Sequence, residues 1–395
     1  MFLLFEGVSV DRSEDRILTT HVGSLIRPPV LRDIEAARME HQRIDEPAYY
    51  KLLKDQVHAA VAQQVDAGLD IINDGEYGKS SWSAYIMERI TGFEIRPEQL
   101  HPLSWLGRDI ERFPGFYHEE FPRAFSGLPT EACVAPISYV DKDSIQRDID
   151  NLKSAIGARD SGLSFLTTVA PASTAYSGVN EYYPSEEEYV FALAEALRQE
   201  YLAVYQSGLL VQVDDAVLAN MYDALVGEGR DHYRNWAELR IAALNHALRD
   251  IPEDRIRYHV CFGSWHVPHV SDAPLEEIVD LILSVKAQAY SIEAANPRHE
   301  HEWRVWEKVK LPDGKILIPG VVTHHTTTVE HPRVVADRII RFANIVGREN
   351  VIAGTDCGFA QSYRLQRVHP EVMWAKFRTL VEGARIASEE LWGKN

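Results

Sequence analysis

Cysteine is scarce in this chain of 395 residues, which contains only Cys133, Cys261 and Cys357. An odd number of widely separated cysteines is a poor disulfide framework and suits a protein of the reducing cytosol. In that compartment, cysteines serve more often in packing, metal binding or catalysis. We therefore expect a cytoplasmic protein in which the cysteines have one of these roles.

Long hydrophobic runs and basic clusters are missing as well. No run approaches the ~18 apolar residues that a membrane helix requires. The chain starts with apolar residues, but Glu6 interrupts them and no cleavage site follows, so we interpret residues 1–16 as an N-terminal extension. The net charge of −18 argues against nucleic acid or an anionic membrane as a partner, because phosphate binding needs a basic face.

Short apolar segments recur along the chain, mostly separated by segments with helical periodicity. Eight strand candidates cover residues 16–24, 69–76, 163–171, 209–215, 256–263, 289–296, 315–323 and 350–358. Helix candidates between them include 48–67, 186–207, 232–249, 274–287 and 332–347. Repeated strand-then-helix units predict parallel strands with crossover helices, and eight units favour a TIM (β/α)8 barrel over an open doubly wound sheet.

A ninth strand candidate, 132–140, follows a stretch rich in Trp, Pro and Phe that lacks helical periodicity. We assign residues 93–140 to an insertion after the second strand, predicted to be a hairpin, with Cys133 as a packing residue. No linker or low-complexity segment divides the chain. Residues 17–395 are therefore predicted to form a single barrel domain.

Polar side chains gather at the predicted carboxyl ends of the strands, where TIM barrels carry their catalytic groups. In chain order they are Ser24, Asp74, Glu76, Asp214, Asp215, His259, Cys261, Glu293, His324, His325, Asp356 and Cys357. His259 and Cys261 are two positions apart on one strand, so their side chains face the same space. An acid, a histidine and two cysteines can thus converge from separate strands.

His259, Cys261, Glu293 and Cys357 form a candidate zinc site, because thiolate, imidazole and carboxylate are the ligands that Zn²⁺ takes in proteins. His-X-Cys alone is more commonly a packed histidine beside a buried free cysteine. Glu293 changes this interpretation, since an unpaired carboxylate at the inner end of an apolar strand needs a cation or a basic partner. Mixed thiolate and imidazole ligands favour zinc over other metals.

This ligand set also constrains the chemistry. Two thiolates and a carboxylate bring three negative charges, whereas the zinc ion carries two positive ones. The metal is therefore a poor Lewis acid for activating water. Such a centre is better suited to holding an incoming thiol as a thiolate, the nucleophilic form of a group whose free pKa is ~8.5. The sequence therefore predicts alkyl transfer to a thiol.

Several motifs in the same order make the chain resemble the catalytic domain of cobalamin-independent methionine synthase, and more closely its short single-barrel relatives, which include epoxyalkane:coenzyme M transferase. The motifs are TTHVGSLIRP (19–28), DGEYGKSSWSAYI (74–86), HVC (259–261), SIEAANP (291–297), IPGVV (318–322) and TDCG (355–358). The similarity runs from about residue 17 to about residue 385.

The resemblance implies a TIM barrel with zinc held by His259, Cys261, Glu293 and Cys357. It also implies that Ser24, Glu76 and Asp214 hold an amino-acid thiol, homocysteine, and that His325 assists proton movement at the methyl donor. The expected partners are this thiol and a methylfolate or smaller methyl donor. The alternative reaction is the addition of a thiol to an epoxide. The alternative without catalysis is a scaffold protein that zinc stabilises.

The chain departs from the family pattern in four respects. It has no room for the N-terminal barrel that helps full-length methionine synthases to hold folate. Asp214-Asp215-Ala216 replaces the family's Asp-Glu-Pro, and FGSW follows the HVC motif in place of a cysteine-rich turn. No tryptophan is matched to the one that stacks on folate. The acceptor site is therefore better supported than the donor site.

Ordinary structural roles remain open for several candidates. Ser24 could close a turn or cap a helix, and Glu76 and Asp214 could form salt bridges with Lys79 or with arginines. His325 could belong to a solvated loop pair with His324. We interpret PRHEHEW (297–303) as a polar loop rather than a second metal site. Residues 80–86 are expected to line the mouth of the barrel. Lys79 and Arg27 either face an anionic donor or lie on the surface.

Overall fold

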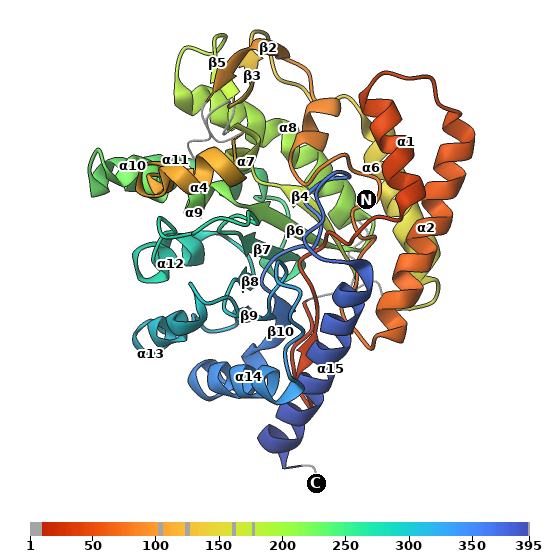
Figure 1. Cartoon of the computed structure of the whole chain (residues 1–395), viewed down its shortest axis with the longest axis vertical. Coiled ribbons are helices and arrows are strands. Elements are labelled where there is room, and N and C mark those ends of the chain that lie inside the picture. Colours follow the sequence, from red (N-terminus) through yellow and green to blue (C-terminus); the bar gives the residue numbers. More distant parts are fainter. Residues whose placement is uncertain (1–9, 102–105, 123–126, 160–162, 176–177, 394–395) are drawn as a thin grey trace.

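The computed structural model describes residues 10–101, 106–122, 127–159, 163–175 and 178–393 (Figure 1). Its centre is a curled parallel sheet of seven strands. In spatial order these are β1 (Leu18–Thr19), β10 (Ile352–Thr355), β9 (Ile316–Val322), β8 (Ala289–Ile292), β7 (Ile256–Val260), β6 (Leu210–Asp215) and β4 (Phe165–Val169). The α/β class and the parallel pairing predicted from the sequence are confirmed.

Where the second strand was predicted, the structure has a short segment around Ile71 and Ile72 that hydrogen-bonds to both edge strands of this sheet. On one side, the Ile71 amide donates to the Thr19 carbonyl of β1 over 3.0 Å. On the other side, the Phe165 amide of β4 donates to the Ile72 carbonyl over 3.1 Å, and Ile72 forms a parallel bridge with Ser164. This segment therefore joins the two edge strands through the backbone.

Long helices follow the strands and cover the outside of the sheet (Figure 1). They are α2 (Glu46–Asp66), α6 (Lys142–Ile156), α8 (Glu186–Gln206), α11 (Arg230–Ala247), α12 (Leu275–Ser284), α14 (Pro332–Val346) and α15 (Pro370–Trp392). Five of these correspond to the predicted helices. Side chains cap the start of two of them: Asp45 accepts from the Ala48 amide at the start of α2, and Ser185 accepts from the Glu188 amide at the start of α8.

The described ranges also contain α1 (Pro29–Met39) and shorter helices. These are α3 (Asp109–Arg112), α4 (Pro114–Glu120), α7 (Pro171–Ala175), α9 (Val217–Asn220), α10 (Tyr222–Val226), α13 (Val305–Lys308) and 3-10 turns at Ala84–Glu88, Glu253–Arg255, Glu300–Arg304 and Arg348–Asn350.

The predicted insertion contains β2 (Phe93–His101), which pairs antiparallel with β3 (Leu128–Cys133), as expected for a hairpin. Two details differ from the prediction. The strand ends at Cys133 instead of continuing to 140, and the segment between the two strands contains α3 and α4 although it lacks helical periodicity. A third strand, β5 (Gly178–Asn180), pairs parallel with β3. Cys133 is fully buried, as predicted for a packing residue.

Most of the core lies between the sheet and its helices, and a second cluster fills the inside of the sheet. The inner cluster consists of Val10, Ile71, Phe165, Leu210, Ala289, Ile316, Ile318 and Ile352. Val10 belongs to the N-terminal segment, and its amide donates to the Asp254 carbonyl over 2.7 Å. The described part of the predicted extension is therefore packed against the sheet, while residues 1–9 lie outside the described residues.

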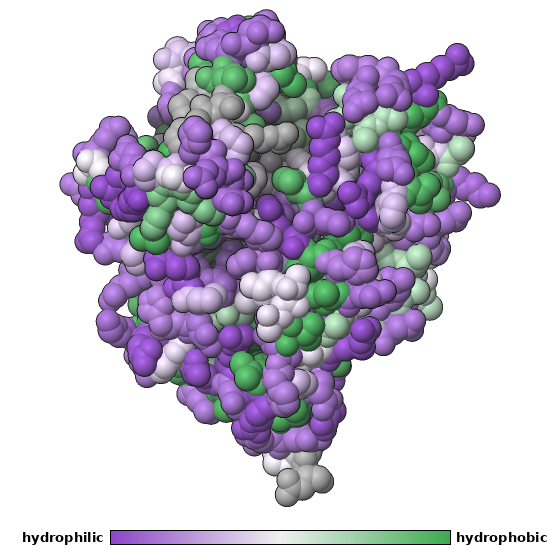
Figure 2. All heavy atoms as spheres, in the orientation of Figure 1, coloured by the Kyte–Doolittle hydropathy of each residue, from purple (hydrophilic) through white to green (hydrophobic). Residues whose placement is uncertain are grey.

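The molecular face in Figure 2 is mostly hydrophilic, with small hydrophobic areas between the charged side chains. Among the helices of the described ranges, none combines the length and the apolar character needed to cross a membrane.

Candidate functional site

The two cysteines predicted as metal ligands meet at the carboxyl edge of the sheet. Cys261 directly follows β7 and Cys357 comes two residues after β10, and their sulfur atoms are 3.3 Å apart. Together with His259 they form a group in which one potential ligand atom from each residue lies within 4.8 Å of the others. All three side chains are buried.

The loop after β7 supplies hydrogen bonds to both sulfur atoms. The Gly263 amide donates to the Cys261 sulfur over 3.3 Å, and the Ser264 hydroxyl donates to the Cys357 sulfur over 3.1 Å. The hydrogen bond between the two thiols lowers the pKa of Cys357 well below its ordinary value and raises that of Cys261. The FGSW segment, in which the chain departs from the family pattern, thus stabilises negative charge on sulfur.

His259 has the environment expected of a metal ligand. The side chain is buried, yet neither ring nitrogen has a hydrogen-bond partner within the described ranges. A buried imidazole without partners is costly, and a bound cation would remove that cost. One imidazole and two thiols are a donor set that fits Zn²⁺.

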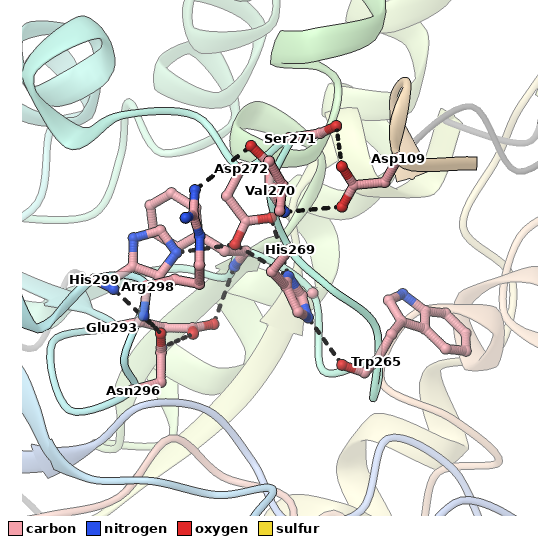
Figure 3. A network of polar contacts seen from close by, with 12 residues as sticks. Asp109, Trp265, His269, Val270, Ser271, Asp272, Glu293, Asn296, Arg298 and His299 are labelled. Atoms are coloured by element: carbon pink, nitrogen blue, oxygen red, sulfur yellow. Dashed lines mark hydrogen bonds and ion pairs between the residues drawn. The ribbon is translucent and has the colours of Figure 1, made fainter. Parts of the chain in front are cut away.

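Glu293, the predicted fourth ligand, lies beside this group and is itself buried. Its carboxylate accepts hydrogen bonds from the Phe262 amide over 3.1 Å and from the Asn296 side chain over 2.8 Å (Figure 3). Burial, followed by the nearby Asp356 and Cys357, raises its pKa well above the ordinary value. The compact group within 4.8 Å does not include Glu293. Its role as a ligand therefore stays a prediction.

A cavity of about 200 Å³ opens onto the cysteines. The three residues predicted to bind the thiol substrate line it, as do three of the four predicted metal ligands: Ser24, Glu76, Asp214, His259, Cys261 and Cys357. Residues of β6 and β7, of the loops after β1, β7 and β10, and of the turn that carries Glu76 thus surround one space. Trp82 and its neighbours also line the cavity, as expected for the 80–86 segment.

Asp214 and its neighbour Asp215 differ in how far their carboxylates are already engaged. Asp215 accepts hydrogen bonds from the Ser173 and Tyr258 hydroxyls and from two amides that begin α9. Asp214 accepts one, from the Gln212 side chain over 2.8 Å. Burial raises the pKa of Asp214 to about 7. Asp214 is therefore the residue of the pair with free acceptor capacity for a ligand.

Glu76 occupies a tight turn that directs it into the cavity. It adopts a left-handed φ of 59°, and its amide donates to the Asp74 carboxylate over 3.0 Å. One carboxylate oxygen, Oε2, has no hydrogen-bond partner in the described part of the chain. Gly23 packs so closely that a Cβ there would be 2.7 Å from the other oxygen. The carboxylate is therefore held in place but left unpaired.

The basic residues considered as partners of Glu76 are used elsewhere. Lys79 donates to the carbonyl and hydroxyl of Thr167 over 2.6 and 2.8 Å. Arg27 donates to the carbonyls of Glu76 and Lys79 over 2.7 and 2.8 Å. Both side chains are buried, so a surface position for them is wrong, and neither lines the cavity. They brace the turn that carries Glu76.

Ser24 contacts the loop that carries Cys357. Its carbonyl accepts from the Phe359 amide over 2.9 Å, and its hydroxyl accepts a longer bond of 3.4 Å from Ala360. A Cβ at Gly358 would lie 2.0 Å from the Ser24 hydroxyl oxygen, so glycine is needed for this approach. Ser24 thus has a structural contact in addition to its place in the cavity wall.

His325 is not among the residues that line the cavity, although it interacts electrostatically with Cys357 and Arg367, which are. Its ring centre is 4.7 Å from that of His324 and 5.8 Å from that of His266. Burial, followed by the neighbouring imidazoles of His269 and His266, lowers its pKa to about 4, so the ring is neutral at pH 7. Its catalytic role stays a prediction.

The PRHEHEW segment belongs to a hydrogen-bonded network that joins two loops. His299 contacts Glu302 through Nδ1 over 2.7 Å and Asp272 through Nε2 over 3.0 Å (Figure 3). Asp272 also contacts His269, which in turn donates to the Trp265 carbonyl. The network therefore ties the loop after β8 to the loop after β7.

Arg367, a basic residue that lines the cavity, was not identified from the sequence. Arg367 lies in the loop between β10 and α15, ten residues after Cys357, and no motif or periodicity marks it. Only its position in the fold brings it to the cavity.

The chain matches the family model described as the catalytic domain of cobalamin-independent synthase, over residues 17–108 and 167–377. Curated relatives include a methionine synthase from Saccharolobus islandicus, 24% identical over 377 residues, covering 94% of this chain and 95% of the relative. A methionine synthase from Thermococcus kodakarensis is likewise 24% identical, over 374 residues, with 94% of each chain covered.

Two solved structures share the fold. A B12-independent methionine synthase from Shewanella sp. W3-18-1, in complex with selenomethionine, superposes with a TM-score of 0.71 at 18% identity, covering 96% of this chain and 99% of that one. A putative vitamin-B12 independent methionine synthase from Listeria monocytogenes gives a TM-score of 0.65 at 21% identity, with 94% and 98% covered.

Proposed function

Since this chain belongs to the family of cobalamin-independent synthase catalytic domains, we propose that it is a zinc-dependent transferase that moves a methyl group to a thiol, with homocysteine as the acceptor. The observation that carries the proposal is the single cavity in which His259, Cys261 and Cys357 lie beside Ser24, Glu76 and Asp214. The cavity thus combines a donor set for a metal with acidic groups for an amine.

Zinc would be held by His259, Cys261 and Cys357, with Glu293 as the fourth ligand. Bound zinc would supply the charge that keeps the acceptor sulfur as a nucleophilic thiolate. The hydrogen bonds from Gly263 and Ser264 hold the two cysteine sulfurs in place and lower the cost of their negative charge.

The acceptor's amino group would pair with Glu76 and Asp214. Each carboxylate is buried in the cavity wall and has free acceptor capacity, and an ammonium group needs such partners when it leaves water. Ser24 would orient the same substrate from the opposite loop. The pair of acids therefore selects an amino-acid thiol over a thiol without an amine.

His325 would move the proton that the methyl donor requires. The residue matches the family's histidine after the strand that ends at Val322, and with a pKa lowered to about 4 its ring is neutral at pH 7, which leaves one ring nitrogen as a proton acceptor. We place the reaction in the cytosol, because the three cysteines are free thiols.

We further propose that residues 17–395 form one TIM barrel, with 93–140 as an insertion. The support for closure is the segment around Ile72, which hydrogen-bonds to β1 and to β4 and so provides an eighth strand position. Its side chains Asp74 and Glu76 then lie at the same end as the other strand-end residues.

The decisive experiment is a screen of acceptor thiols with protein purified without chelators. Zinc content is measured first; methyl transfer is then assayed with homocysteine and with coenzyme M, each supplied with a methylfolate. An epoxide arm tests the other reaction class. We expect about one zinc per chain and transfer to homocysteine. Protein without zinc, or turnover only with coenzyme M and an epoxide, would contradict the proposal.

A further inference from the structure

The insertion holds the loop after β7 through the Asp109 carboxylate at the start of α3. One of its oxygens accepts a hydrogen bond from the Val270 amide over 2.9 Å, and the other accepts from the Ser271 hydroxyl over 2.7 Å (Figure 3). The Asp109 side chain is buried, so both bonds lie away from water. Hydrogen bonds to a carboxylate are among the stronger ones in proteins. Asp109 therefore joins the insertion to the barrel at this loop.

The loop after β7 depends on side chains for its shape. Within the described ranges, residues 262–273 form no hydrogen bond between one backbone group and another. At one end of the loop, the Glu293 carboxylate accepts from the Phe262 amide over 3.1 Å. Near the other end, Asp109 accepts from the Val270 amide. Of these two carboxylates, Asp109 is the one that the insertion supplies.

The turn next to Val270 is in a conformation that needs support. His269 adopts a left-handed φ of 56°, and its ring donates to the Trp265 carbonyl over 2.8 Å. This conformation costs free energy in a residue other than glycine, so it persists only where surrounding contacts hold it. Asp109 supplies such a contact at the next amide along the chain. The position of Trp265 therefore depends on a turn that Asp109 stabilises.

Apolar side chains of the insertion pack against the same loop. Leu106 and Tyr117 are buried in a cluster that also includes Trp265 and Val267. The rings of Phe121 and Trp265 meet edge to face, with their centres 5.4 Å apart. Trp265 also lines the cavity. It thus contacts the insertion as well as the space in which the proposed substrates bind.

The insertion is itself fixed to the barrel beside Asp109. The Asp223 carboxylate of α10 accepts from the Arg108 amide over 2.7 Å and from the Arg108 side chain over 3.1 and 2.9 Å. A Cβ at Gly107 would lie 2.8 Å from this carboxylate, so glycine permits the approach. Asp109 therefore holds the loop after β7 from a segment that is attached to the helices after β6.

The loop carries groups that belong to the candidate site. Gly263 and Ser264 donate to the two cysteine sulfurs, and Trp265 is part of the cavity wall. Cys261 lies at the start of the loop, where its amide donates to the Asp215 carbonyl of β6 over 3.1 Å. Release of the loop would therefore move the groups around the sulfurs, while the sheet keeps Cys261 in place.

We propose that Asp109 is a positioning residue for the transfer reaction: by holding the loop after β7, it sets the positions of Ser264 and Trp265 in the cavity. The inference rests on the proposed methyl transfer and gives the insertion a role in it. Asp109 is not among the residues that line the cavity, so it acts through the loop. It also lies just outside the residues that match the family model.

The first measurement is steady-state kinetics of zinc-loaded Asp109→Ala, which lacks both hydrogen bonds. We expect kcat at saturating substrates to fall about tenfold to 100-fold, because a displacement of about 1 Å in an active site has effects of this size. The KM for homocysteine should not change, since Glu76 and Asp214 lie outside this loop. The zinc content should equal that of the wild type.

The second measurement does not depend on activity. Chymotrypsin cleaves after aromatic residues, and the loop offers Phe262 and Trp265. We expect cleavage within residues 262–272, followed by mass spectrometry, to be at least about tenfold faster in Asp109→Ala, the factor for one lost hydrogen bond to a charged group. Ser271→Ala removes one of the two bonds and should show a smaller increase. Combined with Asp109→Ala, it should add nothing further.

Asp141→Ala is the matched control. Asp141 accepts from the Ser144 amide over 3.0 Å and from the Ser144 hydroxyl over 2.6 Å, so this variant loses the same two kinds of hydrogen bond at the start of α6. We expect a lower Tm, as for other lost helix caps, with wild-type kcat and wild-type cleavage of the loop.

Two results would overturn the inference. One is loop cleavage in Asp109→Ala at the wild-type rate. The other is a folded, zinc-loaded Asp109→Ala with wild-type kcat and only a lower Tm, which would give Asp109 a structural role alone. If Asp109→Ala does not fold, Ser271→Ala decides by the same two measurements. Failure of the proposed function looks different: the zinc-loaded wild type transfers no methyl group, although Asp109→Ala is still cleaved faster than the wild type.

Discussion

The sulfur atoms of Cys261 and Cys357 lie 3.3 Å apart although 96 residues separate them in the chain. Parallel strands bring them together, because Cys261 follows β7 and Cys357 follows β10 at the same edge of the sheet. With His259, whose ring nitrogens have no hydrogen-bond partner within the described ranges, they form a group of three side chains that could hold a metal ion.

Cys357→Ala is expected to abolish zinc binding and activity while the protein stays folded. The residue lies in a loop at the cavity and its buried contacts are confined to a small cluster with Ala216 and Cys261, so its loss removes a ligand and only a minor part of the core. Zinc content by mass spectrometry and thermal unfolding by circular dichroism check this. Cys133→Ala, which removes a buried packing thiol, should keep its zinc. Loss of folding in Cys357→Ala would instead support a structural zinc site.

Metal-free protein treated with diamide is expected to form a disulfide between Cys261 and Cys357. The two thiols need to approach by only about 1.3 Å to reach a bond length near 2.05 Å, and the hydrogen bond between them favours the thiolate that attacks. Diamide accepts the two electrons and two protons. Peptide mapping under non-reducing conditions detects the bond. Added zinc should protect against it; equal oxidation with and without zinc would argue against ligation by these sulfurs.

Asp214→Asn is expected to weaken substrate binding, whereas Asp215→Asn is expected to lower the stability of the protein. Asp214 has free capacity in the cavity, so its amide variant is expected to raise the KM for homocysteine about tenfold to 100-fold with little change in unfolding free energy. Asp215 accepts four hydrogen bonds, so its variant should lose about 1–3 kcal/mol of stability. Urea unfolding and steady-state kinetics check both. The reverse pattern would show that the residues had been assigned the wrong way round.

His299 is expected to make the stability of the protein depend on pH above neutrality. Although burial disfavours its charge, its bonds to Asp272 and Glu302 raise its pKa to about 10, against 6.5 for an ordinary histidine. Because the folded pKa is the higher one, this stabilisation is fully present below pH 6.5 and is lost as the pH rises towards 10. The loss is about 2 kcal/mol, allowing for the coupling within the network.

The measurement is the difference in unfolding free energy between the wild type and His299→Gln, taken by urea titration at several pH values from 6 to 10. The difference should be largest at pH 6 and should shrink as the pH rises. His301→Gln is the control, since His301 lies in the same loop and is exposed. A difference that does not change with pH would mean that His299 is neutral in the folded protein.

The sequence by itself determined the parallel strands, the covering helices and the residues that converge at one edge. These follow from local rules: apolar runs of strand length, helical periodicity between them, and the alternation that puts His259 and Cys261 on one face. Hence Ser24, Glu76, Asp214 and Cys357 were found from their positions at strand ends, and the structure brings them into one cavity.

Only the tertiary structure decided which hydrogen-bond partners, from distant parts of the chain, each polar side chain has. Asp214 and Asp215 are adjacent and chemically alike, but Ser173 and Tyr258 engage only the second. Lys79 and Arg27 bind backbone oxygens from other segments, and Arg367 reaches the cavity from a loop without a motif. Hydrogen bonds of this kind depend on which loops meet after folding, and no spacing along the chain encodes that.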